Sequence, residues 1–270
     1  MDLITIRQSF NHSLPSYDAQ LQGLVPTHMS GSSTLATDPP NFCVEIQHQV
    51  WVKCGLDELG KVSRGIDGEY ISRRENAMAH YTEGDVARSA AIYLLHPVNQ
   101  VLSAIPRFAG IECLSEQTVN GVRSDITFNY PLGSRDKEYR CFAVVEFKKR
   151  GAIIEKEFRD AIRTIPLGDQ SIHAHTAAAV DEEGNSFLQG NAVKMMKQTA
   201  SYAKKHKTRY VALFNWDYLV LVRFVMFDPR NTKNGVGEYC EVTIVRNVGT
   251  ESSKIRAALL GFLLEAHNAS

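Results

Sequence analysis

Two acidic residues and one lysine stand out because their types and spacing suit chemistry on a phosphate. Asp125 lies within the alternating segment 122–130, and Glu146 and Lys148 close the apolar run 139–147. Side chains two positions apart on a strand share a face, so Glu146 and Lys148 should point the same way. Two carboxylates on neighbouring strands repel each other unless a cation neutralises them. We therefore expect Asp125 and Glu146 to hold a divalent cation.

The expected cation is Mg²⁺ or Mn²⁺, because Mg²⁺ keeps several water ligands and needs only one or two carboxylates. A metal held in this way lowers the pKa of a bound water and stabilises charge on a phosphate under attack. A lysine beside it can orient or deprotonate that water, so the set suits phosphodiester hydrolysis. An ExK triplet at a strand end is also common in proteins without such chemistry. The interpretation therefore depends on Asp125 meeting Glu146.

Three expected strands position these residues: 110–118, 122–130 and 139–147. The core of the last, residues 141–145, is apolar without alternation, as expected for a central strand covered on both faces. A helix is expected upstream, over 82–105, with Thr82 as its cap and Pro97 ending or kinking it.

Further elements follow the turn after residue 147. We expect a short helix over 155–165, a longer one over 191–206 capped by Asn191, and a hairpin of strands 210–214 and 219–227. A strand at 241–246 and a helix at 252–266 complete the chain. Strands grouped around helices in this order predict an α/β fold with a mixed central sheet flanked by helices.

Composition limits the classes of protein that the chain can belong to. Its 30 Lys and Arg balance 30 Asp and Glu, so the net charge is zero. That balance argues against tight non-specific coating of nucleic acid, although a local basic groove is compatible with it. Five cysteines without CxxC spacing indicate neither a disulfide scaffold nor a zinc knuckle. With no signal peptide and no long apolar run, we expect an intracellular protein, cytoplasmic or nuclear, with no membrane segment.

The region 11–41 is rich in Ser, Thr, Pro and Gly, and residues 1–41 are expected to form a flexible N-terminal arm. Residues 42–270 are then one domain.

Gln198 and Tyr202 lie four positions apart, hence on one face of the helix 191–206. With them, the order of elements resembles the PD-(D/E)xK (restriction-endonuclease-like) nuclease superfamily: a helix, a three-strand meander with D…ExK, and a helix. The Gln-x-x-x-Tyr element resembles that of the RecB-like branch, and the whole chain is most similar to fungal PD-(D/E)xK nuclease-like proteins. The resemblance covers a core of about 82–227.

The resemblance implies a catalytic set, which here is Asp125, Glu146, Lys148, Gln198 and Tyr202. It also implies an acidic metal ligand on the first helix, for which Glu83 is the candidate and Glu75 the substitute. The spacer between Lys148 and Gln198 is longer than is usual in the family, which indicates an insertion at 151–190.

These observations predict a metal-dependent nuclease acting on DNA or RNA. The alternative is a catalytically inactive module of the same fold that binds nucleic acid or a protein partner, with an effector or toxin role. Basic side chains near the core are either phosphate contacts or a solvated face: Lys149, Arg150, Lys204 and Lys205. A separate pair, His173 and His175, would offer two metal ligands on one strand face.

Overall fold

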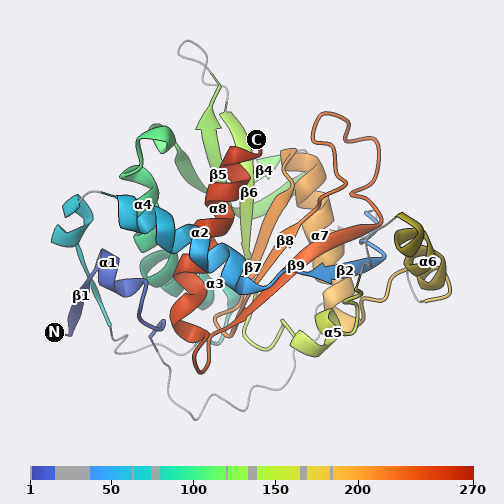
Figure 1. The fold of residues 1–270 in the computed structure, drawn as a ribbon, viewed down its shortest axis with the longest axis horizontal. Coiled ribbons are helices and arrows are strands. Elements are labelled where there is room, and N and C mark those ends of the chain that lie inside the picture. Colours follow the sequence, from blue (N-terminus) through green and yellow to red (C-terminus); the bar gives the residue numbers. More distant parts are fainter. Residues whose placement is uncertain are drawn as a thin grey trace.

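The computed structural model describes residues 2–15, 37–62, 64–73, 80–119, 121–132, 139–164, 169–182 and 185–270. These residues form a seven-stranded sheet in the order β2-β9-β8-β7-β6-β5-β4 (Figure 1). Its strands are β2 (Phe42–Glu45), β4 (Glu112–Val119), β5 (Val122–Pro131), β6 (Tyr139–Phe147), β7 (Tyr210–Phe214), β8 (Tyr218–Arg223) and β9 (Tyr239–Arg246). The pairs β2/β9 and β6/β7 are parallel and the other pairs are antiparallel. The expected mixed α/β sheet is confirmed.

Helices cover both faces of the sheet, and each face has its own apolar core. On one face lie α2 (His48–Lys61), α3 (Glu83–Ala90), α4 (His96–Ser103) and α8 (Ile255–Asn268), packed on side chains such as Phe142 and Val145. On the other face lie α5 (Glu155–Arg159) and α7 (Gly190–His206), packed on Val144 and Val211. The neighbours Val144 and Val145 of β6 thus enter opposite cores, so the expectation that this strand is covered on both faces is confirmed.

The helices α2 and α8 cross in very close contact, visible in front of the sheet in Figure 1. A Cβ added at Gly55 would lie 2.2 Å from the Ala257 carbonyl oxygen, and one at Gly261 would lie 2.0 Å from the Trp51 carbonyl oxygen. Neither glycine can therefore carry a side chain without moving backbone, because real Cβ atoms do not approach this closely.

The helix that carries the expected first-helix acid begins as predicted. The Thr82 hydroxyl accepts a hydrogen bond from Asp85 N at 3.1 Å, and Asp85 accepts one from Thr82 N at 2.9 Å, which makes a capping box. The helix does not end at Pro97. It continues through a π-helical segment (Ala91–Leu95) into α4, whose first turn holds the proline and needs no amide donor there.

The cap of α7 is not the predicted one. Asn191 lies inside the helix, and its side chain donates to the Ala152 carbonyl at 2.9 Å. The first amides are instead capped from α5: Glu157 Oε2 accepts from Asn191 N at 2.8 Å and from Ala192 N at 3.1 Å. A carboxylate at a helix N-terminus also complements the helix dipole.

The prediction of a flexible arm is wrong for residues 2–15. They form β1 (Leu3–Thr5), paired with β3 (Tyr70–Ser72), and α1 (Ile6–Ser9). Ile6 and Phe10 are fully buried in the core that contains α8. Residues 16–36 lie outside the described part of the chain.

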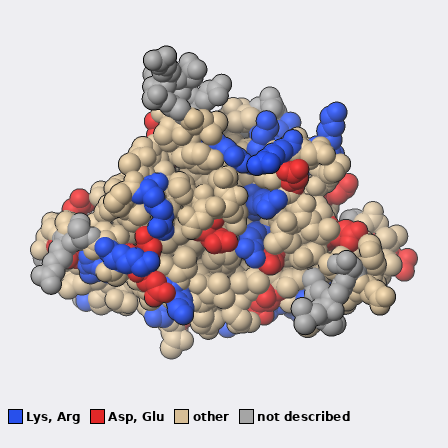
Figure 2. Space-filling view, turned by 45° about the horizontal axis from the view of Figure 1, so that its top comes forward, with Lys and Arg blue, Asp and Glu red and all other residues tan. Residues whose placement is uncertain are grey.

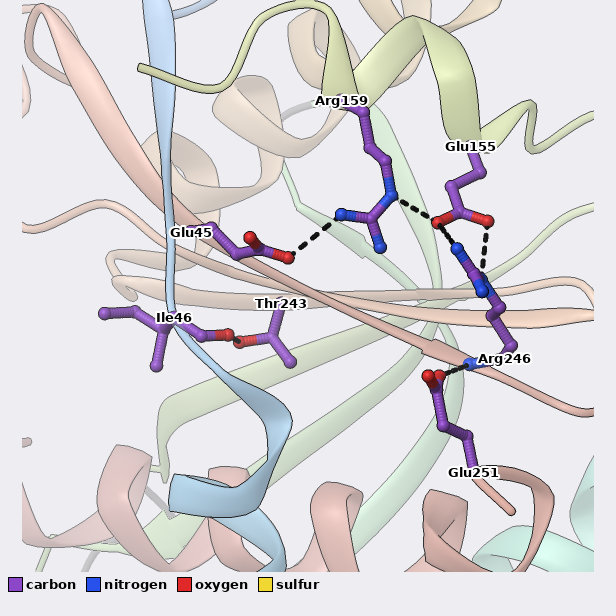
Figure 3. A network of polar contacts seen from close by, with 7 residues as sticks. All are labelled: Glu45, Ile46, Glu155, Arg159, Thr243, Arg246 and Glu251. Carbon is purple, nitrogen blue, oxygen red and sulfur yellow. Dashed lines mark hydrogen bonds and ion pairs between the residues drawn. The ribbon is translucent and has the colours of Figure 1, made fainter. Parts of the chain in front are cut away.

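The expected insertion at 151–190 contains α5 and α6 (Asp169–Ala179), so the predicted helix at 155–165 is correct only in its first half. A polar network attaches α5 to two strands (Figure 3). Arg246 of β9 donates two hydrogen bonds to Glu155, at 2.7 and 2.8 Å, while Arg159 binds both Glu155 and Glu45 of β2. The segment is therefore an integral part of the fold at the β2 edge of the sheet.

Short 3-10 helices complete the structure: η2 (Arg64–Gly68), η4 (Pro106–Phe108) and η5 (Ser252–Lys254). Among the described helices, none combines the length and the apolar character that a bilayer crossing requires.

Candidate active site

The site is built where β5 and β6 stop pairing through their backbones. The ladder between them ends at the pair Ile126 and Val145. Beyond it the side chains replace the missing bonds: Phe147 N donates to Asp125 Oδ2 at 2.8 Å, and Asp125 N donates to Glu146 Oε2 at 3.3 Å. Each carboxylate thus binds the backbone of the other strand, and the two are held as neighbours.

Glu146 is the centre of the cluster. Its Oε1 accepts hydrogen bonds from Lys148 Nζ at 2.7 Å and from Gln198 Nε2 at 2.8 Å. Gln198 Nε2 also donates to the Tyr202 hydroxyl at 2.5 Å, and that hydroxyl is itself hydrogen-bonded to Glu146. The structure therefore brings all five residues of the predicted catalytic set together, from β5, the end of β6 and α7. Their roles stay predictions.

Burial raises the affinity of the acidic groups for protons. Glu146 is 4% exposed, and burial raises its pKa to about 7, with the Asp125 charge acting in the same direction and Lys148 opposing both. Burial also raises the pKa of Asp125 and, with the Glu146 charge nearby, that of the Tyr202 hydroxyl. An added positive charge would reverse this trend for the two carboxyls, because an opposite charge favours the ionised form.

Glu83, in the first turn of α3, reaches the same cluster from the other side of the lysine. Its Oε2 lies 3.9 Å from Lys148 Nζ, while its side chain is about half exposed and bonds the Lys149 backbone. Burial is nevertheless the main cause that raises its pKa. Glu83 thus contacts the lysine, and the Asp125 charge acts with burial to raise its pKa. Its part as a third metal ligand stays a prediction, and the substitute Glu75 lies outside the described residues.

The donor set fits a hard divalent cation that keeps most of its water. Asp125 and Glu146 supply two adjacent carboxylates, and the Gln198 carbonyl oxygen is left as a neutral oxygen donor because its amide nitrogen faces Glu146. No group of three or more His, Cys, Asp or Glu in the described part of the chain is arranged to hold a metal ion. His173 and His175 lie on α6, a helix and not the predicted strand.

Comparisons with family models, with curated proteins and with solved structures found no match to this chain. Its function is therefore inferred from the site's geometry and from the charges around it.

The basic side chains predicted to contact phosphate differ in whether they already bind an acidic partner. Lys149 is exposed directly beside the cluster, and Lys204 and Lys205 lie in the last turn of α7. Arg150 is buried, and it forms hydrogen bonds of 2.5–3.1 Å with both oxygens of Asp217. A phosphate would have to compete with that carboxylate for the guanidinium. The sequence did not predict that Asp217 would pair with Arg150. Asp217 was recognisable only as a turn residue, and tertiary structure brings it to Arg150.

Proposed function

We propose that this protein is a Mg²⁺- or Mn²⁺-dependent nuclease with a PD-(D/E)xK core that hydrolyses phosphodiester bonds of DNA or RNA. The observation that carries the proposal is one bonded cluster in which Glu146 joins Asp125, Lys148, Gln198 and Tyr202. Four residues singled out by residue type and motif, from three separate elements, bond the carboxylate of the fifth, Glu146. Such a convergence supports an active site more strongly than a single hydrogen-bonded pair of residues would.

Asp125 and Glu146 would hold the metal, and the metal supplies charge stabilisation at the phosphate and a bound water of lowered pKa. Lys148 carries three N–H donors, of which one is used at 2.7 Å on Glu146 Oε1. The remaining donors can orient an attacking water or bind a non-bridging phosphate oxygen. Because the lysine is 4% exposed, its charge acts in a site from which bulk water is largely excluded.

Gln198 and Tyr202 position the carboxylate and do not replace it. Gln198 Nε2 holds Glu146 Oε1 in place, and the Tyr202 hydroxyl, itself buried, is tied to both of them. Both come from a single turn of α7, whose own N-terminus is fixed by Glu157. The rotamer of Glu146 is thus locked from one side by a rigid helix, which is what preorganisation of a catalytic carboxylate requires.

The test is metal-dependent cleavage by the purified protein. Fluorescently labelled single- and double-stranded DNA and RNA are incubated with Mg²⁺, with Mn²⁺ and with excess chelator. We expect at least one substrate to be cut with metal and none with chelator. Intact substrates in every metal condition, with protein shown folded by circular dichroism, would contradict the proposal.

One observation favours a second candidate, a nuclease-fold module that binds nucleic acid or a protein partner without cutting. Glu146 Oε1 already accepts hydrogen bonds from Lys148 and Gln198, so this oxygen is satisfied without any metal. For such a module, binding measured in chelator should equal binding measured with Mg²⁺. Binding that tightens with Mg²⁺ and is accompanied by cleavage would exclude it.

A further inference from the structure

A cavity of about 490 Å³ opens at the other end of the strands and helix that carry the active-site cluster. Its walls come from the start of β6, the end of α7 and the loop after β8, where Arg140, Lys205, Lys207 and Arg230 line it. Cys141 in its wall and Glu146 are five residues apart on β6, which corresponds to about 16 Å. The cavity is therefore a separate site.

Cationic side chains predominate over acidic ones in the described lining of the cavity. No described acidic side chain lines it, and none of its four cationic side chains forms an ion pair with a described acid. Two acidic residues close by accept hydrogen bonds from groups other than these cationic side chains. Asp228 accepts from the Arg230 backbone amide at 2.9 Å, and Glu112 accepts from the Tyr139 hydroxyl at 2.6 Å. Figure 2, which turns the top of Figure 1 forward, shows Lys and Arg gathered at the upper right of that face. Unpaired cations in a concave site attract anions.

A buried histidine with one unsatisfied ring nitrogen lies in the wall of the cavity. His206 lines the cavity and is 8% exposed, and its Nε2 is buried without a hydrogen-bond partner in the described structure. Burial lowers its pKa to about 4, so the ring is neutral at pH 7. A buried polar nitrogen of this kind is costly unless something binds it.

The remaining lining is mostly apolar, because Val119, Leu132, Tyr139, Cys141 and Pro229 accompany a single amide, Asn129. A volume of this size, with cations on one side and apolar surface on the other, matches a ligand with a phosphate and a flat base. Inorganic phosphate alone would leave the apolar wall unused.

We propose that this cavity binds a nucleoside phosphate, with the phosphate on Arg140, Lys205, Lys207 and Arg230 and the base against Tyr139. The ligand is either a free nucleotide or the terminal nucleotide of a strand. The site does not depend on the nuclease proposal, because none of its residues belongs to the carboxylate cluster.

The test is calorimetric titration in chelator, so that cleavage cannot occur. Probes are adenosine monophosphate, inorganic phosphate and a 5′-phosphorylated single-stranded oligonucleotide. We expect adenosine monophosphate to bind the wild-type protein more tightly than inorganic phosphate does. The double variant Arg140→Gln, Lys207→Gln should bind it at least about tenfold more weakly, because two charge-assisted contacts are lost. Lys53→Gln, an exposed lysine of α2, is the matched control and should change binding less than twofold.

The oligonucleotide identifies the source of the ligand: competition with adenosine monophosphate indicates the end of a strand, and its absence indicates a free nucleotide. If the double variant fails to fold, the wild-type protein alone tests the inference by nuclear magnetic resonance. Adenosine monophosphate should then shift the His206 ring signals more than most others. No binding at millimolar concentration, unchanged affinity in a folded double variant, or unmoved His206 signals would overturn the inference. Cleavage with Mg²⁺ is measured separately, so either site can fail without the other.

Discussion

The two ends of β6 and α7 differ in how completely their polar groups are satisfied. At one end Glu146 accepts from Lys148, Gln198 and the Asp125 amide, and the surrounding groups are buried and bonded to each other. At the other end four cations without a described ion pair line a cavity, together with His206, whose Nε2 has no described hydrogen-bond partner. A saturated cluster can be catalytic or only structural, whereas an unsatisfied one indicates that something binds there. The two ends therefore need different experiments. Cleavage rates test the Glu146 cluster, and ligand affinities test the cavity.

The largest effect short of removing a carboxylate is expected for Lys148→Met. The variant keeps the length of the side chain but removes the ammonium bonded to Glu146. We expect the turnover number to fall by roughly 10²–10³-fold, the size found when one preorganised donor is lost. The affinity for substrate should change little, since one lysine is a small part of a backbone footprint. Single-turnover kinetics and binding in chelator separate the two.

An equal loss of affinity and rate would instead make Lys148 a simple binding residue. Lys53→Met is the matched control, because Lys53 is an exposed lysine of α2 and is not one of the predicted phosphate contacts.

The next effect concerns His206 and acid stability. Its pKa is about 4 in the folded protein, below the ordinary value of about 6.5, so the unfolded chain binds more protons between these values. The stability associated with the neutral ring is present above pH 6.5 and is lost as the pH falls toward 4. By pH 4 this amounts to about 3 kcal/mol. Urea unfolding from pH 7 to 4 should be less pH-dependent in His206→Gln than in wild type. Equal slopes would contradict the assignment.

A smaller effect is expected for Tyr202→Phe. The change removes one buried hydroxyl that bonds Gln198 and Glu146, and leaves the ring in place. We expect unfolding free energy to fall by about 1–2 kcal/mol, the cost of leaving buried partners unsatisfied. Tyr139→Phe, whose hydroxyl bonds Glu112 near the surface, is the matched control and should cost less. Equal losses of unfolding free energy in the two variants would mean that the Tyr202 hydroxyl stabilises the fold no more than a surface hydroxyl does.

The sequence allowed the local part of the fold to be predicted well. The continuous apolar run located β6 at its true bounds, and the Thr82 cap located the start of α3. The four-residue strand β2 was missed because its place in the sheet comes from parallel pairing with β9, almost two hundred residues away. The buried N-terminal segment was missed for a similar reason: Ile6 and Phe10 are apolar positions in a short, polar-looking stretch whose partners lie on distant helices.

The site was predictable only in part, for the same physical reason. Strand periodicity places Glu146 and Lys148 on one face, and helix periodicity does so for Gln198 and Tyr202. Nothing local showed that Lys148 and Gln198 would share one oxygen of Glu146, or that Asp217 would pair with Arg150. The cations that line the cavity at the other end of β6 and α7 come from three separate segments. No single stretch of sequence therefore contains them all.

The most direct test of the central claim is the cleavage rate of Glu146→Gln with Mg²⁺. The substitution keeps the shape of the side chain and removes the charge on which the cluster depends. We expect cleavage to be undetectable while the circular dichroism spectrum stays that of wild type, and Glu182→Gln, an exposed glutamate after α6, should cut at the wild-type rate. A folded Glu146→Gln protein that still cuts at a rate near wild type would show that this cluster is not the active site.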